Sequence, residues 1–444
     1  ITTRLVGSEM CIRDRFMLAL VSATDAIMLG AVSQTSLSAV SLAGQIQFVL
    51  NLFISGISAG SGIMAAQYWG KKDAASIEEV MPIALRTNLI FSGAFTVFAA
   101  VAPEVLMRIF TSDPALIESG AVYLRAVSLS YLLCGISQIY LILLKNTGYA
   151  TVSSRISCTA VVVNIICNAI LIYGLLGLPA LGIQGAAYAT VAARLVELVW
   201  SYLETKQSGR VQIIWKKMFH AADAILTKDF WRYTTPVLGA ALVWGIAYVS
   251  YSVIMGHMGS DAVAANSITT IAKNMLSCLI RGVSGGAGVL IGNLLGAGEL
   301  DKAKVYGGRL TRMAIVVGMT TGGLLMLISP LIVRFAPLSE TAAEYLQYML
   351  IFCGCNIMAQ SVNTTVLDGI FCAGGDSKFD MKGNLGAMWC FSVPFGFFAA
   401  FVLKWPVMVV YCIVNLDEIV KIPAVYLHYK KYIWVRNITV QEDA

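Results

Sequence analysis

Long apolar runs recur along the whole chain and constrain what it can fold into. A helix needs about 20 predominantly apolar residues to cross the hydrocarbon core of a bilayer. Runs of about that length, separated by polar connections, fill the sequence. They predict an all-α membrane protein with twelve transmembrane helices, at 16–33, 43–68, 83–106, 120–144, 155–177, 182–204, 230–256, 263–294, 309–335, 343–371, 383–403 and 406–428.

The composition agrees with a chain that lies mostly in lipid. Of the 444 residues, 58% are hydrophobic and 13% are charged, whereas soluble globular proteins carry about 25% charged residues. The ten cysteines include no C-x-x-C pair, and His220, His257 and His428 are isolated. We therefore expect no disulfide framework, no metal site and no cofactor.

The basic residues indicate how the chain is oriented. If both termini are cytoplasmic, the outer connections hold Arg108, Arg334 and Lys404, and the inner connections hold many more lysines and arginines. This is the bias expected of a protein whose inner loops are positive. The net charge of +6 therefore does not require a nucleic-acid partner. We expect a multi-pass protein of the bacterial cytoplasmic (inner) membrane.

The two halves of the sequence are related: their first parts align at an offset of 226 residues, and RLVEL (194–198) aligns further along with NLDEI (415–419). GAVSQTSLSAVS (30–41) aligns with GHMGSDAVAANS (256–267), and GISAGSGIMAAQYWGKKD (56–73) aligns with GVSGGAGVLIGNLLGAGE (282–299). Each half has an even number of predicted spans, so both halves share one orientation and the repeat is parallel. Two pseudo-symmetric six-helix bundles around a central cavity follow, with alternating access as the expected mechanism.

The longest polar stretch divides these halves. We expect an N-terminal lobe over 16–205, a cytoplasmic linker over 206–228, a C-terminal lobe over 229–432 and a cytoplasmic tail over 433–444.

Several motifs carry a family resemblance. They are DAIMLG at 25–30, GISAGSG and AAQYWG within 56–70, Asn164-x-x-x-Asn168, GLPALGIQGAAYAT at 177–190 and AGGD at 373–376. In this order and spacing they resemble the multidrug and toxic compound extrusion (MATE) family, nearest to its DinF-like branch. The resemblance implies twelve helices in two lobes and export of organic compounds driven by inward H⁺ or Na⁺.

The sequence departs from the family pattern at two places. Asn168 stands where members often carry an aspartate. The stretch 236–245 has no acid, and Asp368 lies off the register expected for an acid of the tenth helix. The resemblance alone therefore does not support a cation site in the C-terminal lobe.

Residues 1–15 differ from the rest of the chain. LVGSEMCIRDR (5–15) is strongly charged and directly precedes the apolar run at 16–33. Read back into codons, it resembles a transposase sequencing adapter. We expect 1–15 to be a translated adapter and the first helix to be truncated.

Ionisable side chains inside predicted spans mark candidate functional positions, because each costs about 2.5–3.5 kcal/mol to insert. Asp25 lies about 10 Å from the outer end of its helix, at 1.5 Å per residue. Asn164 and Asn168 are four residues apart, so they share a helix face and can supply neutral oxygens beside Asp25. We expect these three residues to hold the coupling ion. A polar face between packed helices is the alternative.

A second group of charges falls in the C-terminal half. Glu418 is the repeat mate of Glu197, and both are intramembrane acids, as is Asp417. One hypothesis pairs Lys273 with Glu418 across a cavity in this lobe. The other is a Lys421–Asp417 pair along one helix, on which Glu418 also comes within reach of Lys421 and which Pro423 is expected to kink just beyond.

Aromatic side chains suit an adaptable substrate cavity. Candidate lining residues are Tyr140, Trp244, Tyr248 and Tyr251, together with Lys273 and Glu418. A lipid-facing aromatic belt is the alternative for any of the four aromatic residues. Gly56, Gly60 and Gly62 indicate close helix packing.

The function that follows is a secondary antiporter, not an enzyme. It exports amphipathic or cationic organic compounds and is coupled to inward H⁺ or Na⁺. A flippase for lipid-linked saccharides is the rival; it would favour a cationic cavity, for which Lys273 and Arg281 are the candidates. We expect a monomer whose partners are small organic molecules and the bilayer.

Overall fold

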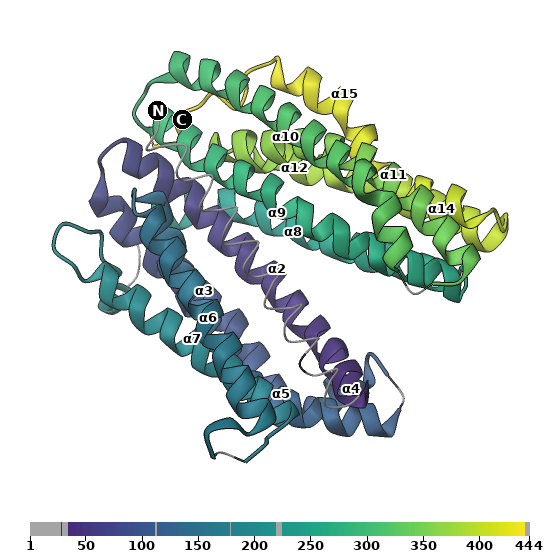
Figure 1. Cartoon of the computed structure of the whole chain (residues 1–444). Helices are drawn as coiled ribbons and strands as arrows, with labels where there is room; N and C mark the ends of the chain where they lie inside the picture. The colour runs from purple at the N-terminus through teal and green to yellow at the C-terminus, as the bar shows by residue number, and fades with distance from the viewer. Residues whose placement is uncertain are drawn as a thin grey trace. The chain divides into compact units, whose positions relative to one another are not determined.

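The computed structural model describes residues 28, 34–111, 113–177, 179–218, 224–336 and 338–439. Asp25 and all but one residue of the predicted first span lie outside these residues. Figure 1 shows that the described chain is built from long helices. It forms two compact units, which meet in sequence between Leu238 and Gly239.

The N-terminal unit contains the helices up to the first part of α8. They are α2 (Gln34–Gly70), α3 (Ala74–Val101), α4 (Pro103–Arg108), α5 (Pro114–Asn146), α6 (Ala150–Tyr173), α7 (Ile183–Thr205) and α8 (Ala224–Gly256), with short 3-10 turns η1 (Leu175–Gly177) and η2 (Trp215–Met218).

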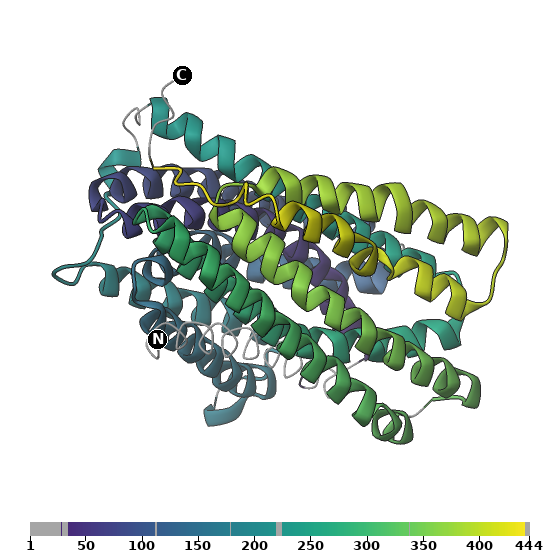
Figure 2. The same ribbon diagram turned by 90° about the horizontal axis from the view of Figure 1, so that it is seen from above.

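The C-terminal unit contains the remainder of α8 and the helices that follow it, coloured green to yellow in Figure 2. The α-helices are α9 (Ser260–Gly296), α10 (Leu300–Phe335), α11 (Glu340–Thr364), α12 (Ser377–Asn384), α13 (Val393–Phe397), α14 (Val407–Val414) and α15 (Asp417–Tyr429). Three π-helical segments continue them: η3 (Thr365–Phe371), η4 (Leu385–Ser392) and η5 (Phe398–Val402).

Each predicted span from 43–68 onward coincides with helical backbone. Among the described residues, nine helices are long and apolar enough to cross a bilayer. The α7 helix, which carries the charged residues Arg194 and Glu197, is not among them. The last predicted span is interrupted, because α14 ends at Val414 and α15 begins at Asp417.

Equivalent helices pack in the same way within each unit. In the N-terminal unit α2, α3 and α7 pack on α5, and in the C-terminal unit α9, α10 and α15 pack on α11. These sets correspond in the order of the sequence repeat. The internal relation seen in the sequence therefore extends to the packing inside each unit.

Small residues let α2 approach the first part of α8 closely. A Cβ atom added at Gly56 would lie 2.8 Å from Leu238 Cα, and one at Gly60 would lie 2.7 Å from Thr234 Cα. Such distances exclude any larger side chain without movement of the helices. The interpretation of these glycines as close-packing residues is confirmed.

The segment after α7 is folded onto the N-terminal unit. Val211 and Ile213 are buried, and Trp215 Nε1 donates a hydrogen bond to the Tyr140 hydroxyl at 2.8 Å. Lys217 Nζ lies 3.7 Å from Glu79 Oε1. Much of the predicted linker therefore packs against this unit.

The segment after α15 is also packed rather than loose. Trp434 is fully buried and lies against α10, where an added Cβ at Gly307 would lie 2.7 Å from its ring. An added Cβ at Gly374 would lie 1.8 Å from the Trp434 carbonyl oxygen. Residues around Trp434, placed in the predicted tail, thus belong to the core of the C-terminal unit.

The glycine contacts predict a difference between two positions of α2. We expect Gly60→Ala to lower the free energy of unfolding by about 1–3 kcal/mol, because the new methyl group overlaps Thr234. Gly44 has no atom within 4 Å of an added Cβ, so Gly44→Ala should be neutral or stabilising by about 0.5–1 kcal/mol. Thermal unfolding of detergent-solubilised protein measures both. Equal melting temperatures for the two variants would contradict the close approach of α2 and α8.

Candidate functional site

The last span is interrupted beside a group of buried charges. Asn415 Nδ2 donates to the Tyr411 carbonyl at 3.0 Å, and such side-chain bonds compete with regular helix. Asn356 of α11 donates to the Asn415 carbonyl. The sequence predicts a kink at Pro423; α15 runs through Pro423, and the interruption of the span lies earlier, between Val414 and Asp417.

The first turn of α15 holds an ion-pair cluster around Lys421. Its Nζ lies 3.4 Å from Asp417 Oδ2 and 3.3 Å from Glu418 Oε1, and it donates to Asn384 Oδ1 at 3.0 Å. All three charged residues are at most 8% exposed. The hypothesis that Lys421 pairs along its own helix is therefore confirmed in geometry, and it extends to both carboxylates.

Two asparagines connect this cluster to neighbouring helices. Asn384 Nδ2 donates to Asp380 Oδ1 at 3.0 Å, within α12. Asn363 Nδ2, from α11, donates to Glu418 Oε2 at 2.9 Å and to the Glu418 carbonyl at 2.6 Å. Asp380 is 4% exposed. The cluster thus joins residues of α11, α12 and α15, all within the C-terminal unit.

Three further charged residues lie at the edge of the cluster and contribute to its net charge. Lys273 of α9 interacts electrostatically with Asp417 and Glu418, but among the described residues it forms no ion pair, so the proposed direct pair with Glu418 is absent. Arg281 and Asp368 interact with each other.

Among the described residues, four carboxylates and three cations interact electrostatically in this region; Asp368 and Arg281 are exposed, and the others are buried or half-buried. The acids are Asp368, Asp380, Asp417 and Glu418, and the cations are Lys273, Arg281 and Lys421. An uncompensated charge in a low-dielectric site costs several kcal/mol. One proton or one bound cation would neutralise the excess carboxylate.

The repeat mate of Glu418 has a different environment. Glu197 is 2% exposed and accepts from Arg194 Nη1 at 2.6 Å, Ser137 Oγ at 2.7 Å and Gln138 Nε2 at 3.3 Å. One cation matches one carboxylate, and three donors satisfy it. Glu197 is therefore held in an ion pair whose charges cancel, within the N-terminal unit.

The two asparagines of α6 lie together as the sequence predicts. Both are buried, and Asn168 Nδ2 donates to Asn164 Oδ1 at 3.1 Å. Asp25, their expected partner, lies outside the described residues. The ion-coupling role of these three residues stays a prediction.

The predicted aromatic lining residues fall in different settings. Tyr140 is 1% exposed and bonded to Trp215, so it lies within the packing of the N-terminal unit rather than on an open surface. Trp244 and Tyr248 stack with ring centroids 5.5 Å apart, and Arg281 lies 5.3 Å above Trp244. Tyr251 packs beside the buried side chains of α14.

Asp380, Asn384 and Asn363 are members of the cluster that sequence reasoning missed. Asp380 and Asn384 are four residues apart, which puts them on one helix face. Lys378 and Lys382 made this stretch resemble a cytoplasmic connection. The four-residue spacing was the available signal, but only the packing against α15 shows its meaning.

Comparison with known proteins shows which family shares this fold. The MatE family profile matches residues 11–170 and 236–398, more than half of the chain. The chain belongs to the MatE family, the MATE transporters. It is therefore a multi-pass membrane transporter and not an enzyme.

Alignments with two curated relatives cover most of this MATE transporter and most of each relative. The "Uncharacterized transporter YisQ" of Bacillus subtilis (strain 168) is 22% identical over 417 residues, which cover 93% of this chain and 90% of the relative. The "Probable multidrug resistance protein NorM" of Agrobacterium fabrum is 24% identical over 358 residues, covering 78% and 73%.

Solved structures share the fold of this transporter at low sequence identity. A MOP superfamily transporter from Pyrococcus furiosus, described by the reverse polarity of its binding pocket, matches with a TM-score of 0.88 at 18% identity and covers 97% of this chain and 95% of its own. A MATE crystal structure in the bent conformation matches with a TM-score of 0.86 at 17% identity over the same shares.

The cluster predicts a strong effect of its central cation. We expect Lys421→Met to destabilise the fold by about 3–5 kcal/mol, because it leaves buried carboxylates without their partner. Adding Asp417→Asn should recover part of that loss. The exposed Lys404 provides the control, since Lys404→Met should change stability by less than about 0.5 kcal/mol. If thermal unfolding finds Lys421→Met as stable as Lys404→Met, the ion pairs do not support the fold.

Proposed function

We propose that this MATE transporter is an antiporter that exports amphipathic or cationic organic compounds in exchange for inward protons. Relatives named as multidrug resistance proteins support the substrate class. The single observation that carries the coupling is the buried cluster, in which the three acids of α12 and α15 exceed the two cations Lys421 and Lys273 by one charge. A charge that is costly when uncompensated is a natural binding site for the coupling ion.

The arrangement favours a proton over a sodium ion. Sodium would bind between oxygen atoms such as those of Asp417 and Glu418, but the Lys421 ammonium already occupies that position. A proton needs only one carboxylate oxygen. Asp380 forms no ion pair among the described residues and is linked to Lys421 through Asn384, so we assign the proton to Asp380.

The interruption between α14 and α15 suggests how proton binding changes the bundle. Broken helices place unsatisfied backbone groups at transporter binding sites, and here asparagine side chains hold those groups. Neutralising Asp380 weakens the electrostatic pull on Lys421. The hydrogen bonds at the interruption can then rearrange as the unit moves between its two states.

Asp25, with Asn164 and Asn168, remains the proposed coupling site of the N-terminal unit. The bacterial relatives support a location in the cytoplasmic membrane. We propose that the transporter acts as a monomer, with both termini in the cytoplasm.

The test is dye efflux from vesicles that contain the purified protein, driven by an imposed pH gradient or an imposed Na⁺ gradient. We expect the pH gradient to drive efflux and Asp380→Asn, which mimics the protonated acid, to reduce it to the level of empty vesicles. The folded fraction is measured by gel filtration before reconstitution.

Two further variants sharpen this test. Glu197→Gln removes a buried carboxylate from a balanced pair, so folded Glu197→Gln should still respond to the pH gradient. Asp25→Asn tests the N-terminal site separately.

Three outcomes would contradict the proposal. Normal pH-driven efflux by Asp380→Asn would refute coupling at this cluster, and efflux driven by Na⁺ alone would refute the proton as the coupling ion. No response to either gradient by folded protein would favour the flippase, with Lys273 and Arg281 facing a phosphate.

A further inference from the structure

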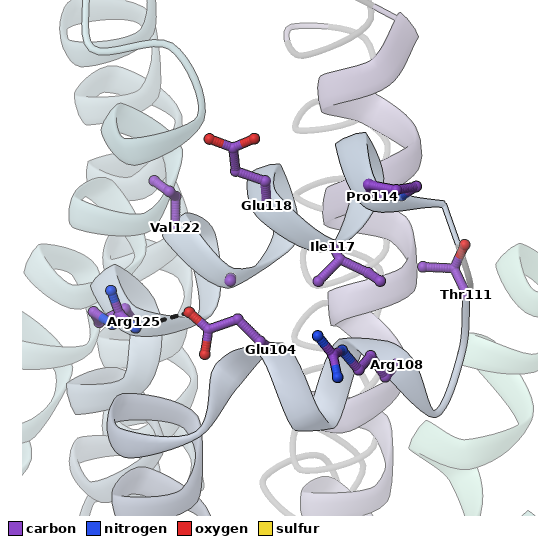
Figure 3. A pocket seen from close by; sticks show the side chains of 9 residues that line it. Glu104, Arg108, Thr111, Pro114, Ile117, Glu118, Val122 and Arg125 are labelled. Atoms are coloured by element: carbon purple, nitrogen blue, oxygen red, sulfur yellow. Dashed lines mark hydrogen bonds and ion pairs between the residues drawn. The ribbon is translucent and has the colours of Figure 1, made fainter.

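A pocket lies where α4 packs against the beginning of α5, far from the buried cluster in sequence. The α4 helix is fixed there by Met107, which is fully buried and fills the space above Gly120, where an added Cβ would lie 2.2 Å from Met107 Cε. The pocket has a volume of about 710 Å³. Figure 3 shows that side chains of both helices and the loop between them line it.

The charges in this pocket are only partly matched. Arg125 of α5 and Glu104 of α4 form an ion pair at 3.0 Å through one carboxylate oxygen, Glu104 Oε1 (Figure 3). Arg108 lies on the same face of α4, four residues after Glu104. Within the described part of the chain it forms no ion pair, although Glu118 also lines the pocket. A guanidinium and the second oxygen of Glu104 are therefore available to a ligand.

Apolar side chains of α4 and of the residues at its two ends are uncovered. Val105 is 61% exposed and Ile109 is 69% exposed, and Val101 at the end of α3 is 75% exposed. The 28 residues of α3 span about 42 Å, longer than a hydrocarbon core of about 30 Å. This end of α3 therefore lies near a membrane surface. At such a depth, apolar side chains are expected to face acyl chains and charged side chains to face headgroups.

We propose that this pocket binds the headgroup of a zwitterionic membrane phospholipid, with its phosphate on Arg108 and its ammonium group at Glu104. Arginine presents paired donors that match a phosphate. The two arginines and two glutamates of the pocket cancel in formal charge, which suits a ligand with one phosphate and one amine. The exposed side chains of Val101 and Val105 contact its acyl chains.

The test is native mass spectrometry of the detergent-purified full chain, titrated with dioleoylphosphatidylethanolamine. We expect Arg108→Gln to weaken binding by about tenfold, the loss of one charge-assisted contact. Arg334 is the repeat mate of Arg108 at the end of α10 and is also exposed, so Arg334→Gln is the matched control and should bind as the unaltered protein does. Both side chains are at the surface, so both variants should fold.

Three results would overturn the proposal. The first is equal lipid binding by Arg108→Gln and Arg334→Gln. The second is equally tight binding of dioleoylphosphatidylglycerol, which lacks the amine. The third is equal binding of free phosphoethanolamine, since a site for a soluble ion would not need the apolar side chains of α4 and its two ends.

Discussion

The structure depends on the need to satisfy every polar group inside the protein, because lipid offers no hydrogen-bond partners. Regular helices meet this need along most of the chain. The interruption between α14 and α15 does not, and there two asparagine side chains from α11 supply the missing donors. Asn356 bonds to the Asn415 carbonyl, and Asn363 bonds to the Glu418 carbonyl. An irregular backbone is thus held in place at the position where charge gathers.

The two units use one repeat position in different ways. In the N-terminal unit Glu197 has a single cation one turn before it and no excess charge. In the C-terminal unit Glu418 has its cation one turn after it, together with the additional acids Asp417 and Asp380. A balanced pair favours one arrangement of its helices, whereas an unbalanced group changes its energy when an ion binds. Pseudo-symmetry of the backbone therefore does not imply symmetry of function.

Much of the fold could be predicted from the sequence, because the length of an apolar run and the repeat of glycine motifs are local signals. The candidate site could be predicted only in part. Glu418 and Asp417 stood out as charges within a span, but Asp380 and Asn384 resembled a cytoplasmic connection, and their burial results from the approach of α15. The burial of Trp434 and the hydrogen bond of Trp215 to Tyr140 were missed for the same reason, since both depend on glycines or side chains distant in sequence.

The position of Trp434 has a consequence for biosynthesis. This side chain fills the space between Gly307 and Gly374, but the ribosome makes it after every helix of the C-terminal unit. Tyr429 stacks on Trp434, and Phe371 stacks on Tyr429. Until Trp434 has been made, these two rings lie beside an unfilled space. The packing of the C-terminal unit is therefore completed only after residue 434 has left the ribosome, and a chain cut before Trp434 would leave the space between Gly307 and Gly374 unfilled.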